Sequence, residues 1–163
     1  MARDQGGASA LSSLPFVPDD GGRAAAGFRG SAGDCVARAI AITTGRPYRE
    51  VYDRLAAGMG AQRRSKRQVR KGQRQAASAR EGVSTSRAWF RAYMAELGFT
   101  WQPAMGIGTG CQVHLRAGEV PEGRCIAVVS RHYVALVGGV IRDTHDPSRG
   151  GARCVYGFWR LES

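Results

Sequence analysis

His-Tyr-Val-Ala-Leu-Val-Gly-Gly-Val-Ile-Arg-Asp-Thr, at residues 132–144, predicts a β-hairpin. Aliphatic and β-branched residues dominate both arms, and the Gly138-Gly139 pair between them is a signal for a two-residue turn. If the two glycines form that turn, His132 and Asp143 become diagonal neighbours on one face of the hairpin. The pattern therefore predicts that an imidazole and a carboxylate lie within reach of each other.

The segments around this hairpin indicate an α+β fold. β-rich runs at residues 124–130 and 154–159 extend the hairpin into an antiparallel sheet. Three helices are predicted ahead of the sheet, at residues 34–45, 47–55 and 84–98. The first helix is apolar nearly all round, so we expect it to lie at the centre of the domain, packed on the C-terminal sheet.

Length and composition predict a flexible N-terminal arm followed by a single domain. The chain has 163 residues, 43% of them hydrophobic, which is enough for a single core. Residues 1–30 are rich in Gly, Ala, Ser and Asp and are expected to be a flexible arm, with the domain at 31–163. No export signal or membrane-spanning run is apparent, which favours a cytoplasmic protein without a membrane partner; a phage particle or host cell is the alternative location.

A candidate nucleophile lies at the start of the central helix. Asp34 is a natural N-cap, and Cys35 follows it, where unpaired amides and the helix dipole stabilise a thiolate. With His132 as base and Asp143 as the acid that orients it, Cys35 would complete a catalytic triad. Asp146, which belongs to an Asp-Pro pair, is the alternative orienting acid. Cys35 could instead be a small buried hydrophobe, as most free cysteines are.

These segments resemble the papain-like cysteine peptidase superfamily, in particular its small bacterial and phage members. Gly-Asp-Cys-Val-Ala-Arg-Ala-Ile-Ala (33–41) and Thr-Gly-Arg-Pro-Tyr-Arg-Glu-Val-Tyr (44–52) are similar to the nucleophile helix and the helix after it. The hairpin at 132–144 is similar to the histidine hairpin, also in double-glycine leader peptidases and peptidoglycan endopeptidases. Many members carry a Gln about six residues before the nucleophile, to complete an oxyanion hole; Arg29 occupies that position here.

The resemblance implies a papain-like fold and a thiol hydrolase acting through an acyl-enzyme. A cysteine peptidase or isopeptidase with a protein or peptide substrate is the leading expectation, and acyl transfer of the transglutaminase type is a variant that uses the same residues. A cell-wall amidase is less favoured, because the sequence shows no export signal.

The other cysteines predict neither a metal site nor a disulfide framework. Cys111, Cys125 and Cys154 are widely spaced and contain no CxxC pair, so free thiols in a reducing compartment are expected. Cys111 and His114 have the spacing of metal ligands, but no second pair at zinc spacing follows them. Structural roles are therefore expected for these residues, and no metal or cofactor is predicted.

A basic insert interrupts the domain at residues 61–80. The chain has a formal charge of +11, and this insert carries eight of its 24 basic residues and no acidic one. One interpretation is that the insert is a solvated surface without a binding role. The alternative function for the whole protein is a non-catalytic binding protein on the same fold, whose insert contacts nucleic acid or an acidic protein. The candidate contacts are Arg63, Arg64, Lys66, Arg67, Arg70, Lys71 and Arg74.

Overall fold

The computed structural model describes residues 12–30 and 33–162, which form four helices and a six-stranded mixed sheet. This confirms the α+β class. The elements in chain order are β1 (Phe16–Pro18), α1 (Cys35–Thr44), α2 (Tyr48–Ala61), α3 (Lys66–Arg70), α4 (Ala88–Glu96), β2 (Phe99–Pro103), β3 (Arg124–Val129), β4 (His132–Val137), β5 (Val140–Asp143) and β6 (Gly157–Leu161).

The predicted hairpin is the β4–β5 pair, which follows the edge strand β1 in the sheet order β1-β5-β4-β3-β6-β2. Val137 pairs with Val140 and Leu136 with Ile141, which is the register expected from a two-residue turn. Gly138 and Gly139 have φ angles of 59° and 76°. Positive φ at both turn positions is what a tight hairpin turn of this kind requires, and glycine adopts it without strain.

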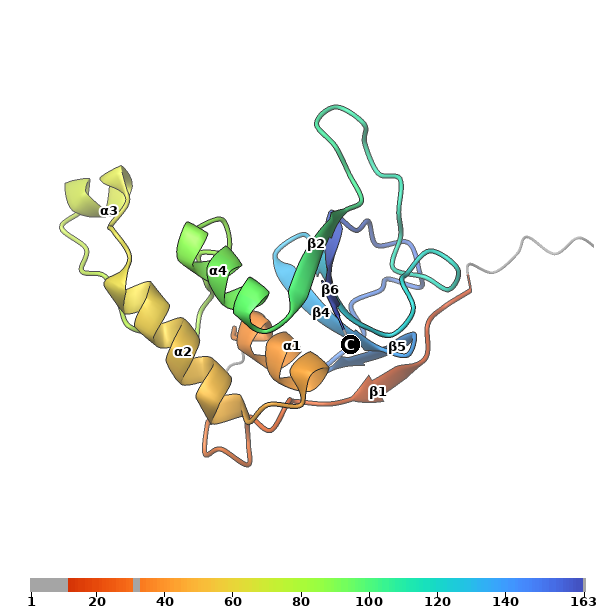
Figure 1. Ribbon diagram of the computed structural model, residues 1–163, viewed down its shortest axis with the longest axis horizontal. Helices are drawn as coiled ribbons and strands as arrows, with labels where there is room; N and C mark the ends of the chain where they lie inside the picture. The colour runs from red at the N-terminus through yellow and green to blue at the C-terminus, as the bar shows by residue number, and fades with distance from the viewer. Residues whose placement is uncertain (1–11, 31–32, 163) are drawn as a thin grey trace, which may run out of the picture.

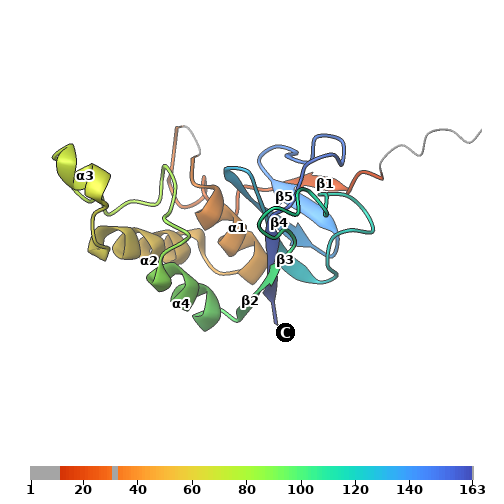
Figure 2. The ribbon, with the colours of Figure 1, turned by 90° about the horizontal axis from the view of Figure 1, so that it is seen from above.

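The helices lie to one side of the sheet, with α1 between α2 and the sheet and α3 farthest from it (Figures 1 and 2). The burial of α1 on several sides explains its nearly continuous apolar sequence, with Ile40 fully buried. Along β4, Tyr133 and Ala135 belong to the core under the helices, whereas Val134 and Leu136 belong to a second cluster. Because strand side chains alternate between faces, the sheet has an apolar core on each side.

The expectation of a flexible N-terminal arm is wrong for residues 12–30. Phe16–Pro18 forms β1, which pairs in parallel with β5, and the amide of Asp19 donates to the carbonyl of Asp143 at 2.9 Å. Leu14 is buried in the second cluster. The open edge of β5 supplies backbone partners that the composition of this segment does not reveal. Residues 1–11 of the expected arm lie outside the described residues.

The sheet also differs from the predicted antiparallel one at its other edge. Phe99–Pro103 forms an unpredicted strand, β2, which pairs with β6. The last strand begins at Gly157 and not at Cys154, which forms an isolated bridge with His114. Within residues 12–30 and 33–162, no helix combines the length and the apolar character that crossing a bilayer requires.

Candidate active site at the start of α1

Three element ends bring the predicted triad together. Cys35 is the first residue of α1, His132 the first of β4 and Asp143 the last of β5. Because β4 and β5 form one hairpin, the first residue of one strand lies beside the last residue of the other. The half-buried thiol and the two hairpin side chains therefore meet at one edge of the helix–sheet interface.

His132 and Asp143 form the closest polar contact of the site. His132 Nε2 lies 2.5 Å from Asp143 Oδ2, and the two side chains are 12% and 3% exposed. Asp143 Oδ1 accepts a further hydrogen bond from the backbone amide of Thr144 at 2.7 Å. The alternative acid, Asp146, is exposed and accepts from the amide of Ser148 at 2.9 Å. Of the two candidate acids, the structure thus places Asp143 against the imidazole.

The imidazole also interacts with the Cys35 thiol. Burial of the ring opposes its charged form, but hydrogen bonds to Asp143 and to Cys35 outweigh this effect and raise the pKa of His132 to about 9. Burial likewise opposes the charged form of Asp143, but the hydrogen bond from His132 helps to lower its pKa. Because Nε2 faces the carboxylate, Nδ1 is the ring nitrogen left for the thiol. The arrangement favours the imidazolium form of His132.

A buried arginine fixes Asp143 from the side opposite His132. Arg38, 3% exposed and one helical turn after Cys35, donates from Nη1 to Asp143 Oδ1 at 2.8 Å and from Nε to Asp34 Oδ1 at 3.1 Å. Asp34 Oδ2 accepts from Arg23 Nε at 3.0 Å and from the Tyr48 hydroxyl. These charges are buried in pairs, as buried charges must be.

This network corrects the sequence-based role of Asp34. The residue occupies the N-cap position of α1, but its side chain makes no capping hydrogen bond. Its carboxylate is turned toward the buried arginines. The sequence carries one sign of this network: Arg38 interrupts an otherwise apolar helical run, and a charge in a buried helix needs a partner.

An aromatic pocket is lined in part by Tyr133, the residue that follows His132 in β4. The pocket, about 410 Å³ in volume, is lined by Trp101, Tyr133, Tyr156 and Trp159, with Arg91 also in the lining. The hydroxyl of Tyr133 accepts from Trp159 Nε1 at 3.4 Å. Burial raises the pKa of Tyr133, and the charge of Cys35 adds to the effect.

The expectation of four free cysteines is wrong for two of them. Cys111 and Cys154 form a disulfide, with their Cα atoms 5.7 Å apart. The bridge between residues 114 and 154 brings these distant segments together, which the spacing in the sequence could not show. Cys35 and Cys125 are free. Cys125 is fully buried, and burial raises the pKa of its thiol to about 12, so it is unsuited to nucleophilic attack.

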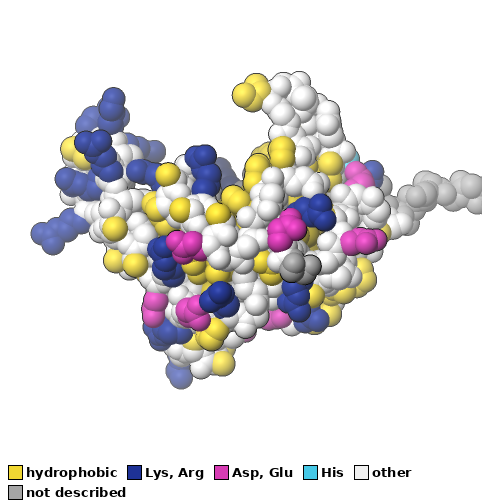
Figure 3. All heavy atoms as spheres, viewed as in Figure 1, with side chains coloured by type: hydrophobic (Ala, Val, Ile, Leu, Met, Phe, Trp, Pro, Cys, Tyr) yellow, Lys and Arg dark blue, Asp and Glu magenta, His cyan; other side chains and the backbone are white. Residues whose placement is uncertain are grey.

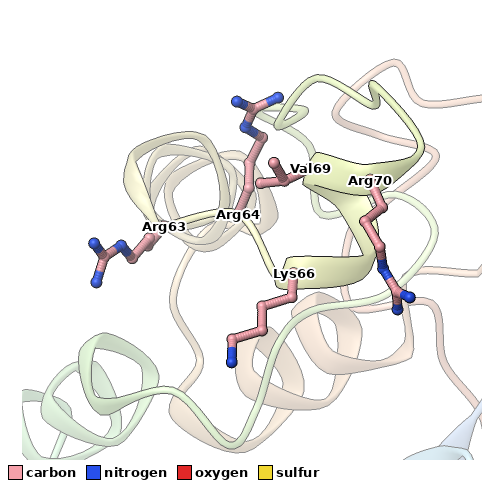
Figure 4. A pocket seen from close by; sticks show the side chains of 5 residues that line it. All are labelled: Arg63, Arg64, Lys66, Val69 and Arg70. Atoms are coloured by element: carbon pink, nitrogen blue, oxygen red, sulfur yellow. The ribbon is translucent and has the colours of Figure 1, made fainter.

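The basic insert is exposed and projects from the helical end of the molecule (Figure 3). After α2 ends at Ala61, only Lys66–Arg70 of the insert is helical, as α3. A hollow there is lined by Arg63, Arg64, Lys66, Val69 and Arg70. Figure 4 shows that its cationic groups point in different directions. This geometry does not converge on one small anion.

Comparison of the chain with protein-family models, with curated proteins and with solved structures found no match. The comparisons therefore assign no superfamily, and a functional argument depends on the geometry of the site.

Proposed function

We propose that this chain is a papain-like thiol hydrolase, a cysteine peptidase or isopeptidase that acts through an acyl-enzyme. One observation carries the proposal: His132 lies against a buried carboxylate and interacts with a thiol at a helix start, which helps to raise the pKa of the imidazole. A nucleophile, a base and a group that orients the base, each in contact with the next, are the components of nucleophilic acyl transfer.

In the proposed mechanism, the Cys35 thiolate attacks the carbonyl carbon of an amide and forms a tetrahedral intermediate. The His132 imidazolium gives its proton to the departing amine, which leaves a thioester on Cys35. The neutral imidazole then takes a proton from water, whose oxygen attacks the thioester and releases a carboxylic acid. If a primary amine replaces water, the same step transfers the acyl group to that amine.

Asp143 would act on this cycle through His132. Its contact with Nε2 orients the ring so that Nδ1 faces the thiol, and Arg38 holds the carboxylate in place from its other oxygen. The backbone amides in the first turn of α1 have no partner within the helix, so the Cys35 amide is available to the developing oxyanion. We propose the Tyr133 hydroxyl, on which the charge of Cys35 acts, as the second donor; the sequence alone did not identify it.

The experiment measures hydrolysis of a peptide library by the full chain, with new amino termini identified by mass spectrometry. We expect cleavage that Cys35→Ala and His132→Gln abolish and that Cys125→Ser leaves unchanged. Adding a biotinylated primary amine tests the transfer variant, because the amine would become attached to the peptide at the cleaved carbonyl. Cleavage that survives Cys35→Ala, or no peptide turnover and no amine incorporation, would contradict the proposal.

A second candidate function is supported by the exposed insert. Its eight cations are all solvent-exposed, and those around α3 point outward, which suits an extended polyanion better than a compact ligand. We propose that the insert contacts nucleic acid or an acidic protein without reading sequence. This role requires no catalysis, and it is also compatible with a hydrolase that the insert directs to its target.

Fluorescence anisotropy with a labelled single-stranded oligonucleotide tests this second function. We expect affinity that falls steeply with salt, persists in Cys35→Ala and weakens by at least about 10-fold when Arg63, Arg64, Lys66 and Arg67 become Gln. The control is the same change at exposed arginines elsewhere, Arg46, Arg49, Arg131 and Arg149. An equal loss in both variants would show a net-charge effect only. Titration with a polyglutamate peptide distinguishes an acidic protein, and binding of neither probe would exclude the role.

A further inference from the structure

A second group of sulfur and nitrogen ligands lies outside the candidate active site. His114 and Cys154 face each other in an antiparallel bridge, and Cys111 precedes His114 by three residues. Cys111 Sγ lies 3.4 Å from His114 Nε2. The ligand atoms of Cys111, His114 and Cys154 all lie within 4.8 Å of one another. The fold thus supplies the third ligand that the Cys111-x-x-His114 spacing lacks in the sequence.

The contacts of the His114 ring indicate which of its two nitrogens could bind a metal. Its Nδ1 lies 3.2 Å from Oε1 of Glu119, whose carboxylate also pairs with Arg116. Donation from Nδ1–H to Glu119 leaves Nε2, the nitrogen that faces the sulfurs, as the one with a free lone pair. A carboxylate that fixes the far nitrogen of a histidine is a usual feature of metal sites, where it orients the ring and raises its basicity. A disulfide alone does not need this arrangement.

We propose that Cys111, His114 and Cys154 bind one Zn²⁺ when the two cysteines are reduced. Two thiolates and one imidazole form a ligand set that suits Zn²⁺, and water would complete a tetrahedron. The Cα atoms of the two cysteines are 5.7 Å apart. The sulfurs would separate to about 3.8 Å, the spacing of two thiolates on tetrahedral zinc. Cys111 is exposed, so its side chain has room for this movement.

Reduction and metal binding convert the Cys111–Cys154 disulfide into two zinc-bound thiolates. A dithiol or phosphine reductant gives two electrons to the disulfide, which takes up two protons and becomes two thiols. The reductant becomes a disulfide or a phosphine oxide, the latter with oxygen from water. Zn²⁺ then replaces the two thiol protons, which are released to solvent. The same two cysteines therefore connect these segments as a disulfide when oxidised and through zinc when reduced.

The test uses the full chain in oxidised form and after reduction with a phosphine under nitrogen. Each sample receives Zn²⁺, excess metal is removed, and bound zinc is measured by mass spectrometry. We expect about one zinc per reduced chain and none per oxidised chain. Co²⁺ in place of zinc should give a thiolate charge-transfer band and the strong visible bands of tetrahedral cobalt. Because this comparison needs no substitution, it does not depend on whether a variant folds.

Single substitutions identify which side chains bind the metal. Cys111→Ser and Cys154→Ser should each remove the cobalt charge-transfer intensity of one thiolate, and Glu119→Ala should weaken zinc binding by about 10-fold or more. Cys35→Ser and Cys125→Ser, the free cysteines outside the cluster, should leave stoichiometry and spectrum unchanged. No zinc on the reduced chain, zinc on the oxidised chain, or binding that requires Cys35 would overturn the proposal. None of these results depends on hydrolase activity.

Discussion

Residues 12–30 and 33–162 contain two groupings of cysteine, histidine and carboxylate, and these differ in burial and in the number of sulfurs. In Cys35, His132 and Asp143, one thiol interacts with an imidazole backed by a carboxylate that is 3% exposed. In the grouping around His114, two sulfurs face the imidazole, and its carboxylate, Glu119, is 24% exposed. One activated thiol suits attack on a carbonyl, whereas two thiols on one imidazole suit a metal ion or a disulfide.

The largest expected difference between the two groupings is the effect of removing their carboxylates on the free energy of unfolding. Asp143→Ala leaves Arg38 without one of its buried ionic partners, and we expect a loss of about 3–5 kcal/mol in the free energy of unfolding. Glu119→Ala, measured with the disulfide intact, should cost about 1 kcal/mol or less because its ion pairs are partly exposed. Urea denaturation measures both values. Equal losses would contradict the contrast in burial.

The charge on His132 should make the first grouping sensitive to alkaline pH. Its folded-state pKa of about 9 lies above its ordinary value of 6.5. The stabilisation is therefore fully present below pH 6.5 and is lost as the pH rises through about 9.

The difference in unfolding free energy between the unmodified chain and His132→Gln measures this effect. It should shrink by at most about 3 kcal/mol between pH 6 and pH 10. A difference that stays constant over this range would mean that His132 is not held in its charged form.

Asp146 provides the smallest expected effect and the matched control for Asp143. It is exposed and accepts a hydrogen bond from the backbone amide of Ser148. Asp146→Asn should therefore change the peptide hydrolysis rate by less than about 2-fold, whereas Asp143→Asn should lower it by about 100-fold or more. The same rate assay compares the two variants. A larger loss from Asp146→Asn would make Asp146 the orienting acid.

The first grouping was more predictable from the sequence than the second, for a physical reason. Gly138-Gly139 sets the register of the hairpin, and that register places His132 beside Asp143. The pairing of Cys111 with Cys154 depends on the approach of segments 43 residues apart, which no local pattern encodes. Catalysis by the predicted triad stays a prediction.

The remaining differences between expectation and structure have the same origin. β1 is only three residues long and owes its place to the open edge of β5, so its composition resembles that of a loop. Asp34 has the residue type of a helix cap, but its carboxylate instead forms ion pairs with Arg23, which precedes α1, and with Arg38 on α1 itself. Local propensity describes what a residue can do, and tertiary partners decide what it does.

The most direct measurement of the central claim is the rate of alkylation of Cys35 by iodoacetamide at pH 6, followed by peptide mapping. If His132 maintains a thiolate at this site, Cys35 in the unmodified chain should react on the order of 100-fold faster than in His132→Gln. Asp146→Asn should react at the unmodified rate. The same slow rate in the unmodified chain and in His132→Gln would contradict an activated nucleophile at Cys35.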